Sequence, residues 1–224
     1  MTHTLRPNLP PLPKRIQSLP VDERGFPVPW FVAWVDGKPE FRAMDGRKWS
    51  LAVEKKLCWV CGQPLGSRFT FVVGPMCGVN RISAEPPSHR DCAEFSAKAC
   101  PFLTMPKMIR RENHMPENIH NPGGVMIRRN PGVTLIWHTR DYKVIRVPNG
   151  ALIRMGEPFE VAWWAEGRQA TREEVEEAIV TGLPLLLEAC DAEERPEDRE
   201  AARTQLEKQK LVLWPLLPTM EVDV

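Results

Sequence analysis

The chain has 224 residues, of which 42% are hydrophobic and 26% are charged, and its formal net charge is +1. A chain of this length can bury a substantial core without help from a partner, and it fits one large domain or two small ones. Its first residues lack the apolar core of a secretory signal, and no apolar run approaches the roughly 18 residues that a membrane span requires. We therefore expect a soluble, cytoplasmic protein without a membrane partner, whose six cysteines stay reduced and favour metal binding over disulfides.

Residues 1–28 are rich in proline and show little apolar periodicity. We expect them to form an extended arm that lies on the surface or on a partner. The prolines stand at positions 7, 10, 11, 13, 20 and 27.

Residues 29–110 are predicted to form a hairpin followed by a zinc-binding module. Two apolar runs, at residues 30–35 and 41–43, flank the pair Asp36-Gly37. This pattern is typical of a β-hairpin, because Asp-Gly suits the tight turn between two strands. A short helix at about residues 48–56 then leads to the first cysteines.

The zinc ligands are predicted to be two pairs of residues, each with CxxC-type spacing. Cys58 and Cys61 precede Gly62, as in a zinc knuckle, and two thiolates at this spacing can hold one tetrahedral ion. His89 and Cys92 form the second pair. We expect Ser88 and Asp91 to form a capping box that places both ligands in the first turn of a helix, on one face. A strand and turn between the pairs would complete a β-hairpin, and this order resembles a treble clef.

Other interpretations of the cysteines and histidines remain open. The thiols could be buried core residues without a metal, or Cys77 could replace His89 as the fourth ligand. An HNH-like metal-dependent nuclease would need a histidine base, for which His114 and His120 are candidates, although their spacing matches no signature. A zinc deaminase does not fit, because its His-x-Glu precedes the CxxC.

Residues 111–170 carry four predicted strands, at 133–138, 142–147, 152–154 and 159–164, separated by turn residues as in an antiparallel meander. Residues 171–224 are predicted to be an acidic helical part. Thr171 and Glu174 form a capping box, Gly182 is placed to end the first helix, and further helices follow at 184–194 and 196–213. One of the adjacent Trp163 and Trp164 must face away from the core, which makes it either a partner anchor or a residue that packs under these helices.

The charge distribution is uneven. Residues 98–154 contain ten Lys or Arg and three acidic residues, whereas residues 157–200 contain four Arg and fourteen acidic residues. The basic pairs are the possible nucleic-acid contacts, and we expect any such binding to be weak and salt-dependent because no aromatic platform accompanies them. These pairs are Arg110 with Arg111 and Arg128 with Arg129.

Five segments of the chain resemble a family of uncharacterised zinc-binding, treble-clef-like proteins of bacterial and bacteriophage genomes. They are residues 58–62, 85–93, 100–103, 129–134 and 166–171. The likeness spans about residues 25–190. It implies a phage or mobile-element context in a bacterial host cell, and it carries no activity.

Together these features predict one compact α+β unit: a Trp-rich hairpin and zinc module, then a meander, then C-terminal helices. The predicted function is that of a non-enzymatic, zinc-stabilised binding protein that acts on a protein partner. The alternative is an HNH-like nuclease or a nucleic-acid-binding protein.

Overall fold

The computed structural model describes residues 3–105, 123, 130–192 and 195–219. Helices and strands are mixed along the chain, as the predicted α+β class requires. Among the described residues, no helix combines the length and apolar character needed to cross a bilayer.

The centre of the molecule is an antiparallel sheet in the order β3-β5-β8-β9. These strands are β3 (Phe69–Val73), β5 (Thr134–Thr139), β8 (Pro158–Ala165) and β9 (Arg168–Gln169). All six residues of β5 are buried, because the strand has a neighbour on each edge and packed elements on each face.

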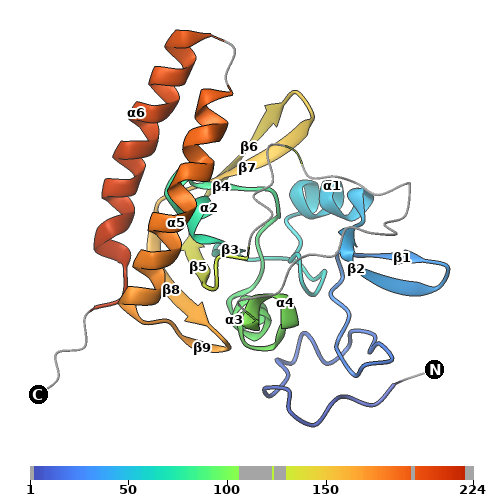
Figure 1. The fold of residues 1–224 in the computed structure, drawn as a ribbon. Helices are drawn as coiled ribbons and strands as arrows, with labels where there is room; N and C mark the ends of the chain where they lie inside the picture. Colours follow the sequence, from blue (N-terminus) through green and yellow to red (C-terminus); the bar gives the residue numbers. More distant parts are fainter. Residues whose placement is uncertain (1–2, 106–122, 124–129, 193–194, 220–224) are drawn as a thin grey trace, which may run out of the picture.

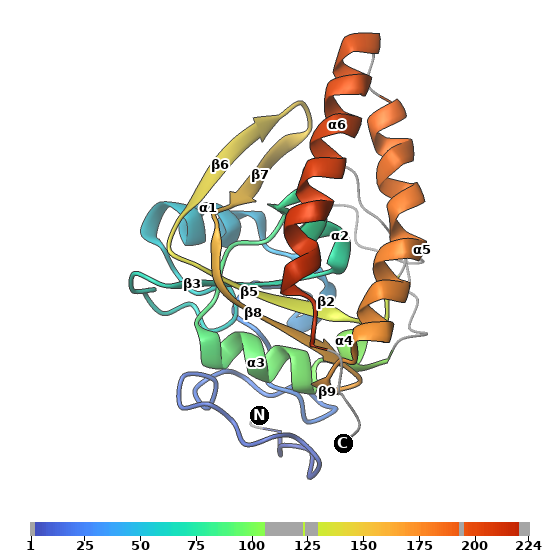
Figure 2. The same cartoon turned by 90° about the vertical axis from the view of Figure 1, so that its left-hand side faces the viewer.

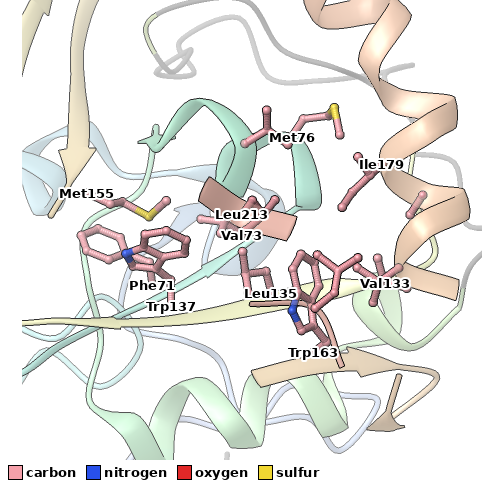
Figure 3. Packing of buried hydrophobic residues seen from close by; sticks show 14 of the residues in the cluster. Phe71, Val73, Met76, Val133, Leu135, Trp137, Met155, Trp163, Ile179 and Leu213 are labelled. Carbon is pink, nitrogen blue, oxygen red and sulfur yellow. The ribbon is translucent and has the colours of Figure 1, made fainter. Parts of the chain in front are cut away.

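The main core lies on one face of this sheet. Phe71, Leu135, Trp137 and Trp163 project from that face and are at most 4% exposed. They pack against α2 (Pro75–Asn80), α5 (Arg172–Asp191) and α6 (Pro196–Leu213) (Figure 3). Trp163 is therefore a core residue, and its indole N–H donates to the carbonyl of Leu216 at 2.9 Å.

The opposite face of the sheet is covered by α3 (Arg90–Ala99) (Figure 2). Ala93 and Ala97 of this helix pack on Ile136 of β5. Small residues on the helix allow the close approach, and Trp164 packs at the edge of the same cluster. Neither of the two adjacent tryptophans is thus left as a free surface anchor.

The predicted meander is wrong, although its four strands form. The hairpin of β6 (Tyr142–Val147) and β7 (Gly150–Met155) belongs to a second sheet, in the order β4-β7-β6, with β4 at Ile82–Ser83. Both edges of β5 are already occupied, by β3 and β8, so β6 cannot pair with it. The β6–β7 hairpin therefore leaves the central sheet (Figure 1).

The N-terminal hairpin is confirmed. Strands β1 (Val32–Val35) and β2 (Lys38–Met44) pair around Asp36 and Gly37, whose φ angles of 51° and 76° are those of a type I′ turn. Helix α1 (Gly46–Lys55) follows, capped by the Asp45 side chain, which accepts from the backbone N–H of Arg47.

The C-terminal part is a pair of long helices, not three helices. The capping box of Thr171 and Glu174 is confirmed at the start of α5. The predicted stop at Gly182 is wrong, because α5 continues through Gly182 and Pro184 to Asp191. Gly182 allows close packing instead: a Cβ there would lie 2.8 Å from the sulfur of Met76.

Candidate metal centre

The four predicted ligands come together at one point beside the central sheet. Cys58 and Cys61 follow α1, and His89 and Cys92 stand at the start of α3. Their ligand atoms all lie within 4.8 Å of one another. Cys58 and Cys92 have no exposed surface, and Cys61 is 8% exposed. These four side chains could hold a metal ion.

The backbone around the first pair is a tight turn with its amides directed at sulfur. The N–H of Gly62 donates to the carbonyl of Cys58 at 2.8 Å, and the N–H of Cys61 donates to the sulfur of Cys58 at 3.4 Å. Gly62 has a φ of 73°, and a Cβ there would lie 2.7 Å from the ring of Trp30. Only glycine fits both constraints.

The second pair is positioned differently from the prediction. Ser88 does not cap α3: its backbone forms an antiparallel bridge with Thr70 of β3, and His89 is the N-cap residue, without a side-chain capping bond. Since the bridge holds Ser88 extended, the helix begins after His89. The N–H of His89 donates to the sulfur of Cys58 at 3.3 Å and so joins the two pairs.

The predicted β-hairpin between the two pairs is also wrong. Strand β3 pairs with β5, whereas β4 pairs with β7, so the two strands lie in different sheets. Helix α2 separates them, and the Thr70–Ser88 bridge links the end of this segment back to β3.

The orientation of His89 identifies its metal-binding atom. Its Nε2 lies 3.1 Å from the carbonyl oxygen of Pro64, and its Nδ1 lies 3.4 Å from the sulfur of Cys61. A carbonyl can only accept, so Nε2 carries the proton and Nδ1 offers its lone pair toward the cluster. A second hydrogen bond of this kind usually fixes the ring of a metal-binding histidine.

The sulfur atoms are coupled in the metal-free chain. Burial opposes ionisation of Cys58, but hydrogen bonds from Cys61, Cys92 and His89 outweigh it and lower the pKa of Cys58. The interaction with Cys58 raises the pKa of Cys61 to about 11 and also raises the pKa of Cys92. The hydrogen bond to Cys58 raises the pKa of His89 as well. A cation that binds all four side chains would displace the protons that keep Cys61 and Cys92 in the thiol form.

The donor set fits a tetrahedral metal ion. Ligand–metal distances of about 2.3 Å for sulfur and about 2.0–2.1 Å for nitrogen separate tetrahedral ligand atoms by less than about 4 Å. The contact of 3.4 Å between Cys61 and His89 falls in that range. Four protein ligands fill a tetrahedral site, so such a site leaves no position for a substrate.

The N-terminal arm covers the centre, which the sequence analysis missed. Ile16 is 1% exposed and packs in a cluster with the three cysteines, Val60 and Phe95. Leu12 and Leu19 flank this cluster. The residues at 12, 16 and 19 follow the i, i+4, i+7 spacing, which is the signal that could have shown that this arm packs on its own chain. Arg15 anchors it further with an ion pair to Asp91 of 2.9 Å.

The other candidate residues lie elsewhere. Cys77 belongs to α2, where burial raises the pKa of its thiol to about 11, and it is not part of the cluster. The nucleic-acid and nuclease candidates lie outside the described residues and remain predictions. They are Arg110, Arg111, Arg128 and Arg129, with His114 and His120.

Comparison of the chain with protein-family models, with curated proteins and with solved structures finds no match in any of the three. The resemblance to bacterial and bacteriophage proteins is therefore neither supported nor opposed by these comparisons, and the centre is interpreted from its own chemistry.

Proposed function

We propose that this protein is a non-enzymatic binding protein stabilised by one structural zinc ion and acting through contacts with a protein partner. The observation that carries the proposal is the closed set of three thiols and one imidazole. Sites of this composition are characteristic of structural zinc, whereas catalytic zinc sites keep one position for water.

The choice of zinc rests on the ligands and their surroundings. Cysteine and histidine in a tetrahedral arrangement select zinc or iron over magnesium and calcium, which prefer oxygen. The protein is expected to be colourless when isolated with its metal, because zinc has a filled d shell. A treble-clef-like module in a phage or mobile-element protein is the context that the sequence resemblance suggests.

A protein partner is supported by large apolar side chains at the surface. Trp34 on β1 is 47% exposed, and Leu211 and Val212 of α6 are 72% and 47% exposed. Exposed apolar side chains of this size are common at protein interfaces.

The experiment is affinity capture from the native cells, followed by reconstitution with the purified partner. Wild type is compared with Leu211→Ser/Val212→Ser and with Gln205→Ser/Lys208→Ser, a control at exposed polar positions of the same helix. The proposal expects a partner that binds wild type and the control and is lost with the apolar pair.

An assay on plasmid and single-stranded DNA with Mg²⁺ or Mn²⁺ tests the nuclease alternative. We expect no cleavage. Cleavage that needs the divalent metal and disappears in His114→Ala or His120→Ala would replace the binding function with a catalytic one.

A further inference from the structure

An open cavity of 480 Å³ lies next to the metal centre, where the start of α3 meets β3, β5 and β8. Ser67, Arg68, Thr70, His138 and Phe159 are among its lining residues. A smaller pocket of 280 Å³, lined by Ser67, Arg68 and Arg140, shares two of these residues and adjoins it. The metal ligand His89 reaches the wall, but the groups considered below are not part of the metal centre.

Thr70 and His138 of the cavity wall belong to a row of polar residues across the central sheet. Thr70, His138 and Glu160 are direct neighbours on β3, β5 and β8. The register then shifts, because Thr139 pairs with Pro158, and Phe159 is the extra residue of the bulge. This bulge turns the ring of Phe159 over His138, with ring centroids 6.0 Å apart. Bulges often re-aim side chains beside functional sites.

His138 is buried, and only one of its two ring nitrogens has a hydrogen-bond partner among the described residues. It is 2% exposed, and its Nδ1 forms a hydrogen bond of 2.9 Å with the hydroxyl of Thr70. Its Nε2 is buried and has no hydrogen-bond partner among the described residues. An unpaired buried nitrogen costs free energy, which makes a ligand for it favourable.

The charges at the rim do not cancel. Arg90 donates to both Glu94 and Glu160, and Arg15 pairs with Asp91, so these two arginines balance two of the three carboxylates and leave one negative charge. Arg68 and Arg140 are exposed and form no ion pair with any described acidic residue. Both guanidinium groups instead lie over the ring of Phe159, at 6.0 Å and 5.7 Å from its centroid. Two positive charges are thus gathered at one edge of the cavity.

We propose that this cavity binds a phosphate group carried by an organic ligand. The two guanidinium groups supply charge-assisted donors, and the Ser67 hydroxyl offers a further donor. His138 Nε2 donates in the tautomer in which Nδ1 accepts from the Thr70 hydroxyl, and the N-terminus of α3 adds its positive dipole. Donors that converge from several directions suit a tetrahedral phosphate better than a planar carboxylate.

The test is calorimetric titration of the zinc-loaded wild-type protein with inorganic phosphate, with adenosine monophosphate and with a short 5′-phosphorylated single-stranded DNA. Acetate serves as the carboxylate control. We expect phosphate-bearing probes to bind and acetate to bind at least about tenfold more weakly, because one charge-assisted hydrogen bond lost is worth about that factor.

The variants are Arg68→Ala/Arg140→Ala and the control Arg146→Ala, an exposed arginine of the β6–β7 hairpin away from the cavity. The double variant should weaken phosphate binding by about tenfold or more, with zinc content and melting temperature unchanged, and the control should bind like wild type. The three probes separate the sources: tighter binding of adenosine monophosphate or DNA than of inorganic phosphate indicates an organic phosphate, and equal binding of all three indicates that the phosphate group alone is recognised. The proposal is overturned if no phosphate-bearing probe binds wild type, if acetate binds equally well, or if the double variant and the control bind alike.

Discussion

At the residue scale, the cluster of Cys58, Cys61, His89 and Cys92 joins two segments that lie about thirty residues apart in the chain. Two pairs of ligands three positions apart, the first followed by glycine, identify Cys58, Cys61, His89 and Cys92 as the cluster that the structure assembles. The sequence does not show that Ser88 is held by Thr70 of a distant strand, so the predicted capping box at α3 is wrong. Nor does the sequence show that the carbonyl oxygen of Pro64 accepts a hydrogen bond from Nε2 of His89.

The first prediction at this scale concerns the pH dependence of metal binding. The pKa values of Cys61 and Cys92 are raised, so both thiols keep their protons at neutral pH, whereas Cys58 is already a thiolate. Binding one ion then releases these two protons, and a third from each His89 that is protonated because its pKa is raised, so the apparent zinc affinity should fall by about 100-fold or more for each pH unit of acidification. Chelator competition at pH 6.5, 7 and 7.5 measures this as about tenfold or more per half unit. An affinity that does not change with pH would show that the thiols are ionised before the metal arrives.

At the element scale, a turn and a helix cap that depend on a few neighbouring residues form as predicted, whereas the pairing of the strands differs from the prediction. Asp36-Gly37 and the Thr171 capping box act within a few residues, and both form as predicted. The predicted meander is wrong because the neighbours of a strand depend on which edges of the sheet are already occupied. One edge of β5 is occupied by β3, which lies some sixty residues earlier in the chain. The predicted helix end at Gly182 is wrong because the sequence does not distinguish a glycine that ends a helix from one that allows a neighbouring side chain to approach closely.

The prediction at this scale concerns the start of α5. In Thr171→Ala the N–H of Glu174 loses its side-chain acceptor, and the free energy of unfolding should fall by about 1 kcal/mol. Urea denaturation of the zinc-loaded protein measures it. Glu173→Gln, at the neighbouring first-turn position without a capping role, is the control and should change stability by less than about 0.5 kcal/mol. Equal effects of the two substitutions would assign the stabilisation to helix charge instead of the cap.

At the scale of the whole molecule, the N-terminal arm, the metal centre and the sheet form one packed structure. Ile16 reaches the cysteine cluster, and α3 carries ligands at its start and covers the sheet along its length. Because prolines dominate its composition, the arm is predicted from the sequence to be extended and to lie on the surface or on a partner. Ile16, which is 1% exposed, instead joins the arm to the cysteine cluster.

The prediction at this scale is that the arm stabilises the centre. Ile16→Ala should lower the free energy of unfolding by about 2–5 kcal/mol, as expected for truncation of a buried isoleucine, and should make residues before Gly25 sensitive to protease. Leu5→Ala, at a position 40% exposed, is the control and should change neither. An arm that is cleaved at the same rate in both variants and in wild type would mean that Ile16 does not hold it in place.

Whether the four side chains hold a structural zinc ion is decided by the metal content of single-ligand variants, measured by native mass spectrometry, together with their thermal melts. We expect one zinc per chain in wild type and in Cys77→Ala. It predicts no zinc and a loss of stability on the order of 5 kcal/mol or more in Cys58→Ala and Cys92→Ala, because structural zinc supplies folding free energy directly. Zinc lost in Cys77→Ala and retained in His89→Ala would contradict the account and assign the fourth ligand to Cys77.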